Sequence, residues 1–577
     1  MKTKNLVIVS VLLGMQACSL NHEQAGLDSP KPESAVVINE TIAGREQPQV
    51  ATRSEQDGMA NEVARASERK LYKTEQLAAK IASAPASYAA ADNMYMPDII
   101  YQPEQSNETY RSYLDNAVFK TSEQAVSTFS IDVDTGSYAN VRRFLQQGQK
   151  PDPQAVRVEE LVNYFRYDDA APRDKETPFS VTTEIATTPW NNKTHLMRIG
   201  IRGYDVEKNK LPPANLVFLV DVSGSMQSPD KIDLLKSGLK LLVKEMKAAD
   251  KISLVVYAGN SGVVLEPTSG SEKHKINAAI DGLAAGGSTN GAAGIELAYN
   301  MAQRGFIKDG INRIMLATDG DFNVGVTDFE QLKTMVETKR QQGVSLTTLG
   351  FGTGNYNDQL MEQLADVGNG NYSYIDTLGE ARKVLVGEMQ STLFTIARDV
   401  KIQIEFNPAQ VSEYRLIGYE NRVLRREDFN NDKVDAGEIG AGHSVTALYE
   451  ISLAKDATRI DDLRYGNNTV TKSTNAKTGD ELAFVKFRYK LPTEDRSRLI
   501  NQPITAQQIV ANVDKTSESF RFSAAVAAFG QSLRGGKYME HYALENILAL
   551  ARGARGQDAD GYRGEFIQLV QLAQSIN

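Results

Sequence analysis

The chain has 577 residues, 41% of them hydrophobic, so it can bury several cores and we expect two or three folded domains. Its formal net charge of −9, without a dense block of Lys or Arg, argues against a nucleic-acid partner. After the N-terminal segment, no stretch approaches the roughly 18 apolar residues that a membrane-spanning helix needs.

Residues 1–17 have the layout of a secretory signal peptide, because Lys2 and Lys4 precede the apolar stretch 6–13. The cysteine that follows, Cys18, is the only one in the chain. The segment resembles a bacterial lipoprotein signal, in which this cysteine is lipidated and becomes the mature N-terminus. The resemblance implies a lipid anchor in the cell envelope, and the serine after the cysteine favours the outer membrane if the host is Gram-negative. The alternative is a cleaved signal with an incidental cysteine.

Residues 18–95 are rich in Ala, Ser, Glu, Gln and Lys, which predicts a flexible tether. From 96 to 213 the composition becomes globular, and we expect an N-terminal domain rich in strands with some helix. Within it, the acidic run Asp132–Ser137 could hold a cation, although a strand end that caps the next helix is the simpler interpretation.

Between 214 and 398, short apolar strands alternate with segments of helical period, which predicts a doubly wound, Rossmann-like α/β domain. The first strand precedes a helix with an apolar face, and the last helix is expected over 378–398. In such sheets, ligands bind beyond the carboxyl ends of the strands, where the strand order reverses.

Oxygen-bearing side chains follow the strands of this domain. Asp221, Ser223 and Ser225 come directly after the first strand, Thr289 lies in a Gly-rich loop, and Asp319 ends a later strand. Hydroxyl and carboxylate oxygens without His or Cys suit a hard dication such as Mg²⁺, with Mn²⁺ or Ca²⁺ as alternatives. The other interpretation is that the two aspartates only cap helices.

Residues 399–577 continue with alternating strands and then become helical after about 520. Strands on both sides of the α/β segment suggest that this segment is inserted into, or flanked by, a β-sandwich that both halves build. The predicted chain is therefore multidomain, with a central α/β domain, β-rich flanks and a helical C-terminus.

The five-residue constellation resembles the metal-ion-dependent adhesion site of the von Willebrand factor type A family. By that resemblance, Ser223, Ser225 and Thr289 hold the metal, and Asp221 and Asp319 act directly or through water. Ser288 is the alternative third hydroxyl. The whole arrangement is similar to an uncharacterised family of bacterial lipoproteins with a type A domain.

This resemblance implies a membrane-anchored adhesin or scaffold whose metal captures an acidic group of a protein partner. The sequence shows no phosphate-binding loop, zinc-protease motif or nucleophile elbow, so we do not expect an enzyme. The alternative is a hydrolytic activity in the flanking domains, with the type A domain as a recruiting module.

Overall fold

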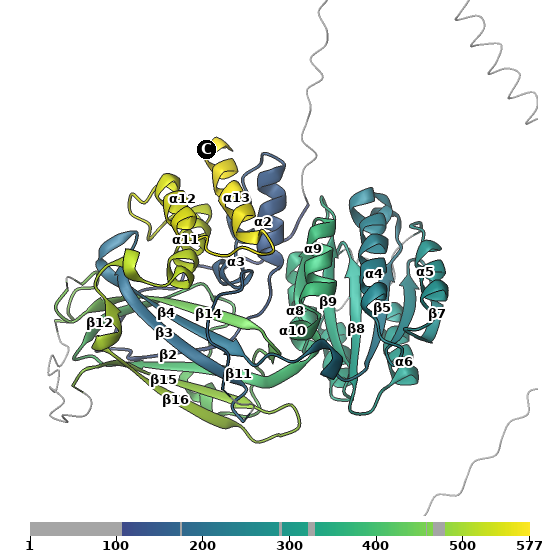
Figure 1. Ribbon diagram of the computed structural model, residues 1–577, viewed down its shortest axis with the longest axis horizontal. Coiled ribbons are helices and arrows are strands. Elements are labelled where there is room, and N and C mark those ends of the chain that lie inside the picture. Colours follow the sequence, from purple (N-terminus) through teal and green to yellow (C-terminus); the bar gives the residue numbers. More distant parts are fainter. Residues whose placement is uncertain are drawn as a thin grey trace, which may run out of the picture. The chain divides into compact units, whose positions relative to one another are not determined.

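The computed structural model describes residues 107–173, 176–287, 291–320, 329–456, 458–464 and 479–576 (Figure 1). The predicted signal peptide, Cys18 and the predicted tether lie outside the described residues, as do Ser288 and Thr289. No helix within the described ranges is both long and apolar enough to cross a membrane.

The central domain is the predicted doubly wound α/β domain. Its six strands run in the order β10-β9-β8-β5-β6-β7, and every neighbouring pair is parallel except β6 and β7. Their bounds are β5 Ala214–Asp221, β6 Lys251–Tyr257, β7 Ser261–Ser269, β8 Ile311–Thr318, β9 Ser345–Phe351 and β10 Tyr372–Ile375. The first strand, β5, lies between β6 and β8, so the strand order reverses at β5.

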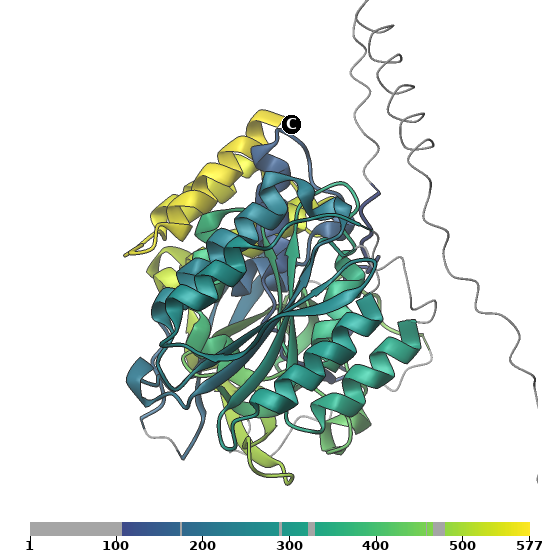
Figure 2. The same ribbon diagram turned by 90° about the vertical axis from the view of Figure 1, so that its right-hand side faces the viewer.

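Helices cover both faces of this sheet (Figure 2). Successive side chains of β5 point to opposite faces, and both sets are buried. Leu216 and Phe218 point to the face covered by α4 and α5, whereas Val217 and Leu219 point to the face of α6, α7 and α8. The helices are α4 Leu234–Glu245, α5 Lys273–Asp281, α6 Gly291–Gly305, α7 Phe329–Arg340 and α8 Asp358–Val367. The central strand is therefore buried on both faces, which explains its continuous apolar sequence.

The predicted helix over 378–398 is helical only as far as Leu393, and a π-helical turn interrupts it. The chain forms α9 (Leu378–Arg382), a π-helical turn and α10 (Met389–Leu393), and strand β11 then begins at Thr395. Ile396, which we expected on the apolar face of the helix, lies in β11 and is buried in the neighbouring β-sandwich. Ile396 fits the helical spacing but lies in a strand, because the backbone on either side of it pairs with β13 (Ile439–Gly440) instead of continuing the helix.

Strands from before and after the α/β domain form the predicted sandwich. One sheet has the order β1-β12-β14-β4-β3-β17, and the other has β13-β11-β15-β16 with β2 paired to β11. From the N-terminal part come β1 Phe119–Lys120, β2 Val126–Ser130, β3 Phe179–Thr188 and β4 Asn191–Gly203. From the C-terminal part come β12 Val411–Ile417, β14 Ser444–Leu453, β15 Glu481–Lys490, β16 Arg498–Thr505, β17 Ile509–Val510 and β11, which ends at Phe406.

The two sheets share one core. Ile199 of β4 and Ala447 of β14 are register partners in the first sheet, and Ile402 of β11 pairs with Phe129 of β2 in the second. All four side chains are fully buried in the same hydrophobic cluster. The α/β domain is thus inserted between β4 and β11, and the flanking ranges 96–213 and 399–577 contribute strands to one sandwich. Their residue boundaries remain predictions.

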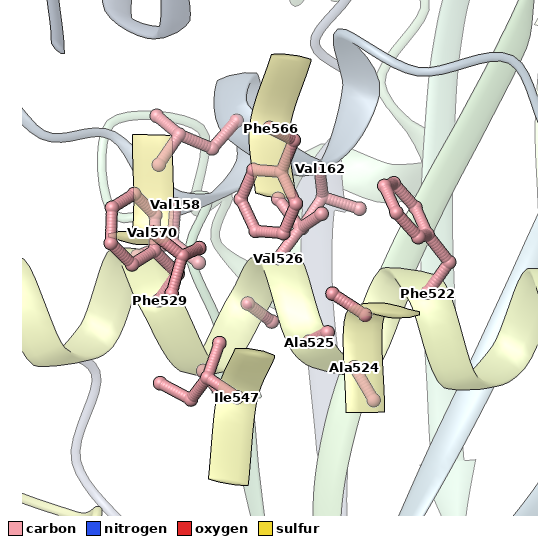
Figure 3. Close-up of a cluster of buried hydrophobic side chains, with 14 of the residues drawn as sticks. Val158, Val162, Phe522, Ala524, Ala525, Val526, Phe529, Ile547, Phe566 and Val570 are labelled. Carbon is pink, nitrogen blue, oxygen red and sulfur yellow. The ribbon is translucent and has the colours of Figure 1, made fainter. Parts of the chain in front are cut away.

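A helical layer packs on the sandwich, as expected for the C-terminal residues. It consists of α2 Gly136–Gln146, α3 Val158–Asn163, α11 Glu518–Leu533, α12 Leu544–Gly553 and α13 Tyr562–Ile576. Phe522 and Phe529 of α11 each pack against Phe566 of α13, with ring centroids 5.5 Å apart (Figure 3). Because the N-terminal α3 also lines this cluster, the two ends of the described chain share a core.

Buried arginines join the α/β domain to these other layers. Arg157, immediately before α3, donates to both carboxylate oxygens of Asp358 at the start of α8, at 2.5 and 3.2 Å, and pairs with Glu160. Arg422, which follows β12, donates to Asp366 of α8 at 2.7 Å and also pairs with Asp134 and Asp132. Among the described residues, no group of three or more His, Cys, Asp or Glu side chains is suited to a metal ion. The Asp132–Ser137 run leads from β2 into α2, but the side chain of Thr135, the N-cap residue of α2, makes no capping hydrogen bond.

Candidate metal centre

Asp221 ends the central strand β5 and is fully buried. One of its carboxylate oxygens accepts the backbone N–H of Ser223 at 2.9 Å. The other oxygen accepts hydrogen bonds from the hydroxyls of Thr318, at 2.8 Å, and Tyr257, at 3.2 Å. Three neighbouring groups therefore fix the orientation of this carboxylate at the carboxyl edge of the sheet.

The two predicted serines follow in a short turn. Ser223 precedes a 3-10 turn over Gly224–Gln227, and the Ser223 and Ser225 hydroxyl oxygens lie 3.0 Å apart. Ser223 is buried and Ser225 is partly exposed. Two hydroxyl oxygens at this separation can both contact one small cation, because adjacent ligands of an octahedral Mg²⁺ lie about 3 Å apart when each metal–oxygen distance is about 2.1 Å.

The loop that carries the third predicted hydroxyl is tied to this turn. The backbone N–H of Gly286 donates to the carbonyl of Val222 at 2.7 Å, and the N–H of Gly224 donates to the carbonyl of Gly287 at 3.1 Å. These bonds hold the loop beside the serine turn as far as Gly287. Thr289 and its alternative, Ser288, follow directly and lie outside the described residues.

Asp319 follows β8, the strand next to β5, and is fully buried. The register of the two strands pairs Val220 with Ala317, so both aspartates lie at the same edge of the sheet. One carboxylate oxygen of Asp319 lies 3.0 Å from the ammonium nitrogen of Lys231. The described members of the predicted set thus gather at one edge, together with a cation that the sequence analysis did not select.

Burial sets the electrostatics of the site. It raises the pKa of Asp221 above its usual range, and the neighbouring charge of Asp319 acts in the same direction. Hydrogen bonds from Ser223 and Thr318 lower the pKa and favour the ionised form. Burial and the charge of Asp221 also raise the pKa of Tyr257, so this phenol stays a hydrogen-bond donor. A carboxylate in such surroundings is stabilised by a further positive charge.

Four residues that contact the two aspartates were not predicted from the sequence: Lys231, Asn355, Thr318 and Tyr257. The side-chain amide nitrogen of Asn355 lies 3.4 Å from the same Asp319 oxygen that contacts Lys231. Thr318 could have been found, because it immediately precedes Asp319 at the strand end. Lys231 carried no such signal, because a lysine at the start of an amphipathic helix is normally solvent-exposed.

The donor chemistry fits a hard dication. Two carboxylates and two hydroxyls lie at the same edge of the sheet, and neither a thiolate nor an imidazole is among these four groups. Two carboxylates balance the two charges of Mg²⁺, which leaves the ion able to take an outside ligand. The residues present therefore fit a magnesium ion that keeps open or water-filled positions.

Three family models match successive parts of the chain. The model for von Willebrand factor matches residues 104–198, and the model for the von Willebrand factor type A domain matches 215–386. The model described as the C-terminal part of the uncharacterized protein YfbK matches residues 391–576. The type A match spans the α/β domain and contains every candidate metal ligand.

Individual proteins are similar over different lengths. Uncharacterized protein YfbK of Escherichia coli (strain K12) is 52% identical over 474 residues, which are 81% of each chain. Inter-alpha-trypsin inhibitor heavy chain H3 of Pongo abelii is 23% identical over 273 residues, 44% of this chain and 31% of the relative. A solved structure of a von Willebrand factor type A protein from Catenulispora acidiphila is 12% identical with a TM-score of 0.38, and covers 70% of this chain and 91% of its own.

Proposed function

We propose a function from one premise: this chain belongs to the YfbK family, and its central domain is a von Willebrand factor type A domain. The chain is a binding protein of the cell envelope. It captures an acidic group of a protein partner through Mg²⁺ held at the carboxyl edge of the α/β sheet. The observation that supports this function best is the pair of serine hydroxyls, 3.0 Å apart, directly after the buried carboxylate of Asp221.

Ser223, Ser225 and Thr289 would hold the metal, with Asp221 and Asp319 as direct ligands or through water. The metal supplies a Lewis-acidic centre that accepts an oxygen ligand from outside the chain. Asp221 orients the serine turn through its bond to the Ser223 N–H. Lys231 adds a positive charge beside Asp319, so a loaded site would carry an excess positive charge and favour an anionic ligand.

A lipid anchor at Cys18 would place this site at a membrane surface. The proposal rests on the basic residues and apolar stretch that precede this cysteine. More than one acyl chain is needed for stable anchoring, and a lipoprotein N-terminus supplies it. We expect wild-type protein in the membrane fraction after cell fractionation, and the Cys18→Ser variant in the soluble fraction or unprocessed. Wild-type protein found wholly in the soluble fraction would contradict the anchor.

Metal-dependent capture can be tested on immobilised protein without residues 1–18. The beads are loaded with a detergent extract of the cell envelope in buffer with Mg²⁺, washed, and eluted with EDTA. We expect wild-type beads to release specific proteins with EDTA and Asp221→Ala beads to release none of them. Asp281→Ala is the matched control, because this aspartate is exposed at the end of α5. Equal recovery from wild type and Asp221→Ala would refute metal-dependent capture.

A further inference from the structure

Lys231 is a buried cation inside the candidate metal centre. Its side chain is 7% exposed, and its ammonium nitrogen lies 3.0 Å from a carboxylate oxygen of Asp319, whose side chain is fully buried. The same nitrogen lies 3.4 Å from the amide oxygen of Asn355. Lysines are rarely buried unless they are paired, so the ion pair with Asp319 accounts for the burial of Lys231.

Two backbone features bring Lys231 to this place. It lies in a π-helical turn over Pro229–Asp233 that precedes α4, and this turn brings the lysine toward the sheet edge. Its stem then crosses Gly352, where a Cβ atom would lie 1.9 Å from the Lys231 Cε. Gly352 also has a φ of +74°, which other residues rarely adopt. A side chain at position 352 would therefore displace the lysine from Asp319.

The charge at this position opposes a metal. A dication that used Asp319, directly or through water, would share this carboxylate with the ammonium group, and like charges repel strongly in a buried site. Lys231 also uses an Asp319 oxygen that a metal or its water could otherwise use. Without metal, the ammonium group of Lys231 balances the negative charge of the buried Asp319 carboxylate and so offsets part of the cost of burying that charge.

We propose that Lys231 is an internal counter-ion that regulates this site: it stabilises the metal-free form through Asp319 and thereby lowers the affinity for Mg²⁺. The inference rests on the proposed function, because it presupposes a metal at these ligands. The centre then binds Mg²⁺ only when Mg²⁺ is abundant. The repulsion between Mg²⁺ and the Lys231 ammonium reduces the free energy that metal binding releases.

The test compares Mg²⁺ titrations, by calorimetry, of wild type, Lys231→Met and the matched control Lys240→Met. Lys240 belongs to α4 and forms an ion pair with Asp281 in which both side chains are exposed, so its loss leaves the site unchanged. We expect Lys231→Met to bind Mg²⁺ about tenfold or more tightly than wild type. We expect Lys240→Met to bind Mg²⁺ as wild type does.

A second measurement separates regulation from a purely structural role. In EDTA, Lys231→Met should melt at a lower temperature than wild type, and saturating Mg²⁺ should raise its melting temperature more than it raises that of wild type. If Lys231→Met does not fold, Lys231→Gln, which keeps a hydrogen-bond donor without the charge, takes its place. A neutral variant that folds and binds Mg²⁺ no more tightly than wild type overturns the inference. Absence of Mg²⁺ binding by wild type instead refutes the proposed function.

Discussion

Asp221→Ala is expected to abolish Mg²⁺ binding in calorimetric titrations, with an affinity loss of at least about 100-fold, and Asp319→Ala is expected to do the same. Each variant loses one of the two carboxylates that balance the charge of the ion. Asp221→Ala also releases the Ser223 N–H, so the serine turn loses its orientation. The Thr318 hydroxyl loses its buried acceptor, which costs about 1–3 kcal/mol of stability.

Asp281→Ala serves as the control in these titrations as well. It removes an exposed carboxylate from the same domain, so it matches the change in net charge. Circular dichroism should show that all three variants keep the α/β fold. If both site variants were to bind Mg²⁺ as wild type does, the constellation would be a coincidence and the aspartates would serve only as structural residues.

The second large effect concerns stability. We expect Arg157→Met to lower the free energy of unfolding by about 3–5 kcal/mol, because removal of one partner leaves buried charges uncompensated. Arg157 is 1% exposed and pairs with Glu160 and Asp358, whose side chains are equally inaccessible. Asp358 starts α8 of the α/β domain, so the variant weakens the junction between that domain and the helical layer.

Urea unfolding monitored by circular dichroism measures this effect. Arg304→Met is the matched control, because Arg304 makes two 3.0 Å bonds to Glu266 but both side chains are more than half exposed. Exposed pairs contribute about 0–1 kcal/mol, so the control should unfold almost as wild type does. An Arg157→Met variant as stable as the control would show that the buried pairs do not stabilise the junction.

The sequence predicted the α/β domain well because its signals are local. The apolar run before Asp221 is buried on both faces, and the strand end is marked by the aspartate itself. Asp221 and Asp319 could be assigned to one edge because the carboxyl ends of parallel strands meet there. Ser223 and Ser225 were selected because the segment after β5 resembles the metal site of the type A family.

Lys231 could not be predicted in the same way. Its burial depends on Asp319, 88 positions later in the chain, and on the missing side chain at Gly352 of a third segment. A lysine within a predicted helix gives no sequence signal of an ion pair with a residue so distant in the chain. The start of β11 was missed for a related reason, because Ile396 fits a helical period equally well until its pairing partners near Ile439 are known.

A crystal of the protein grown with Mn²⁺, with anomalous diffraction recorded from the metal, tests the central claim most directly. The proposal predicts one strong anomalous peak at the carboxyl edge of the sheet, within about 2.3 Å of the hydroxyl oxygens of both Ser223 and Ser225, close to the ligand distances of Mg²⁺. The Thr289 hydroxyl should complete the set, and Asp221 and Asp319 should contact the metal directly or through water. A fully occupied Mn²⁺ elsewhere, with no peak beside the two serines, would contradict the proposed metal centre.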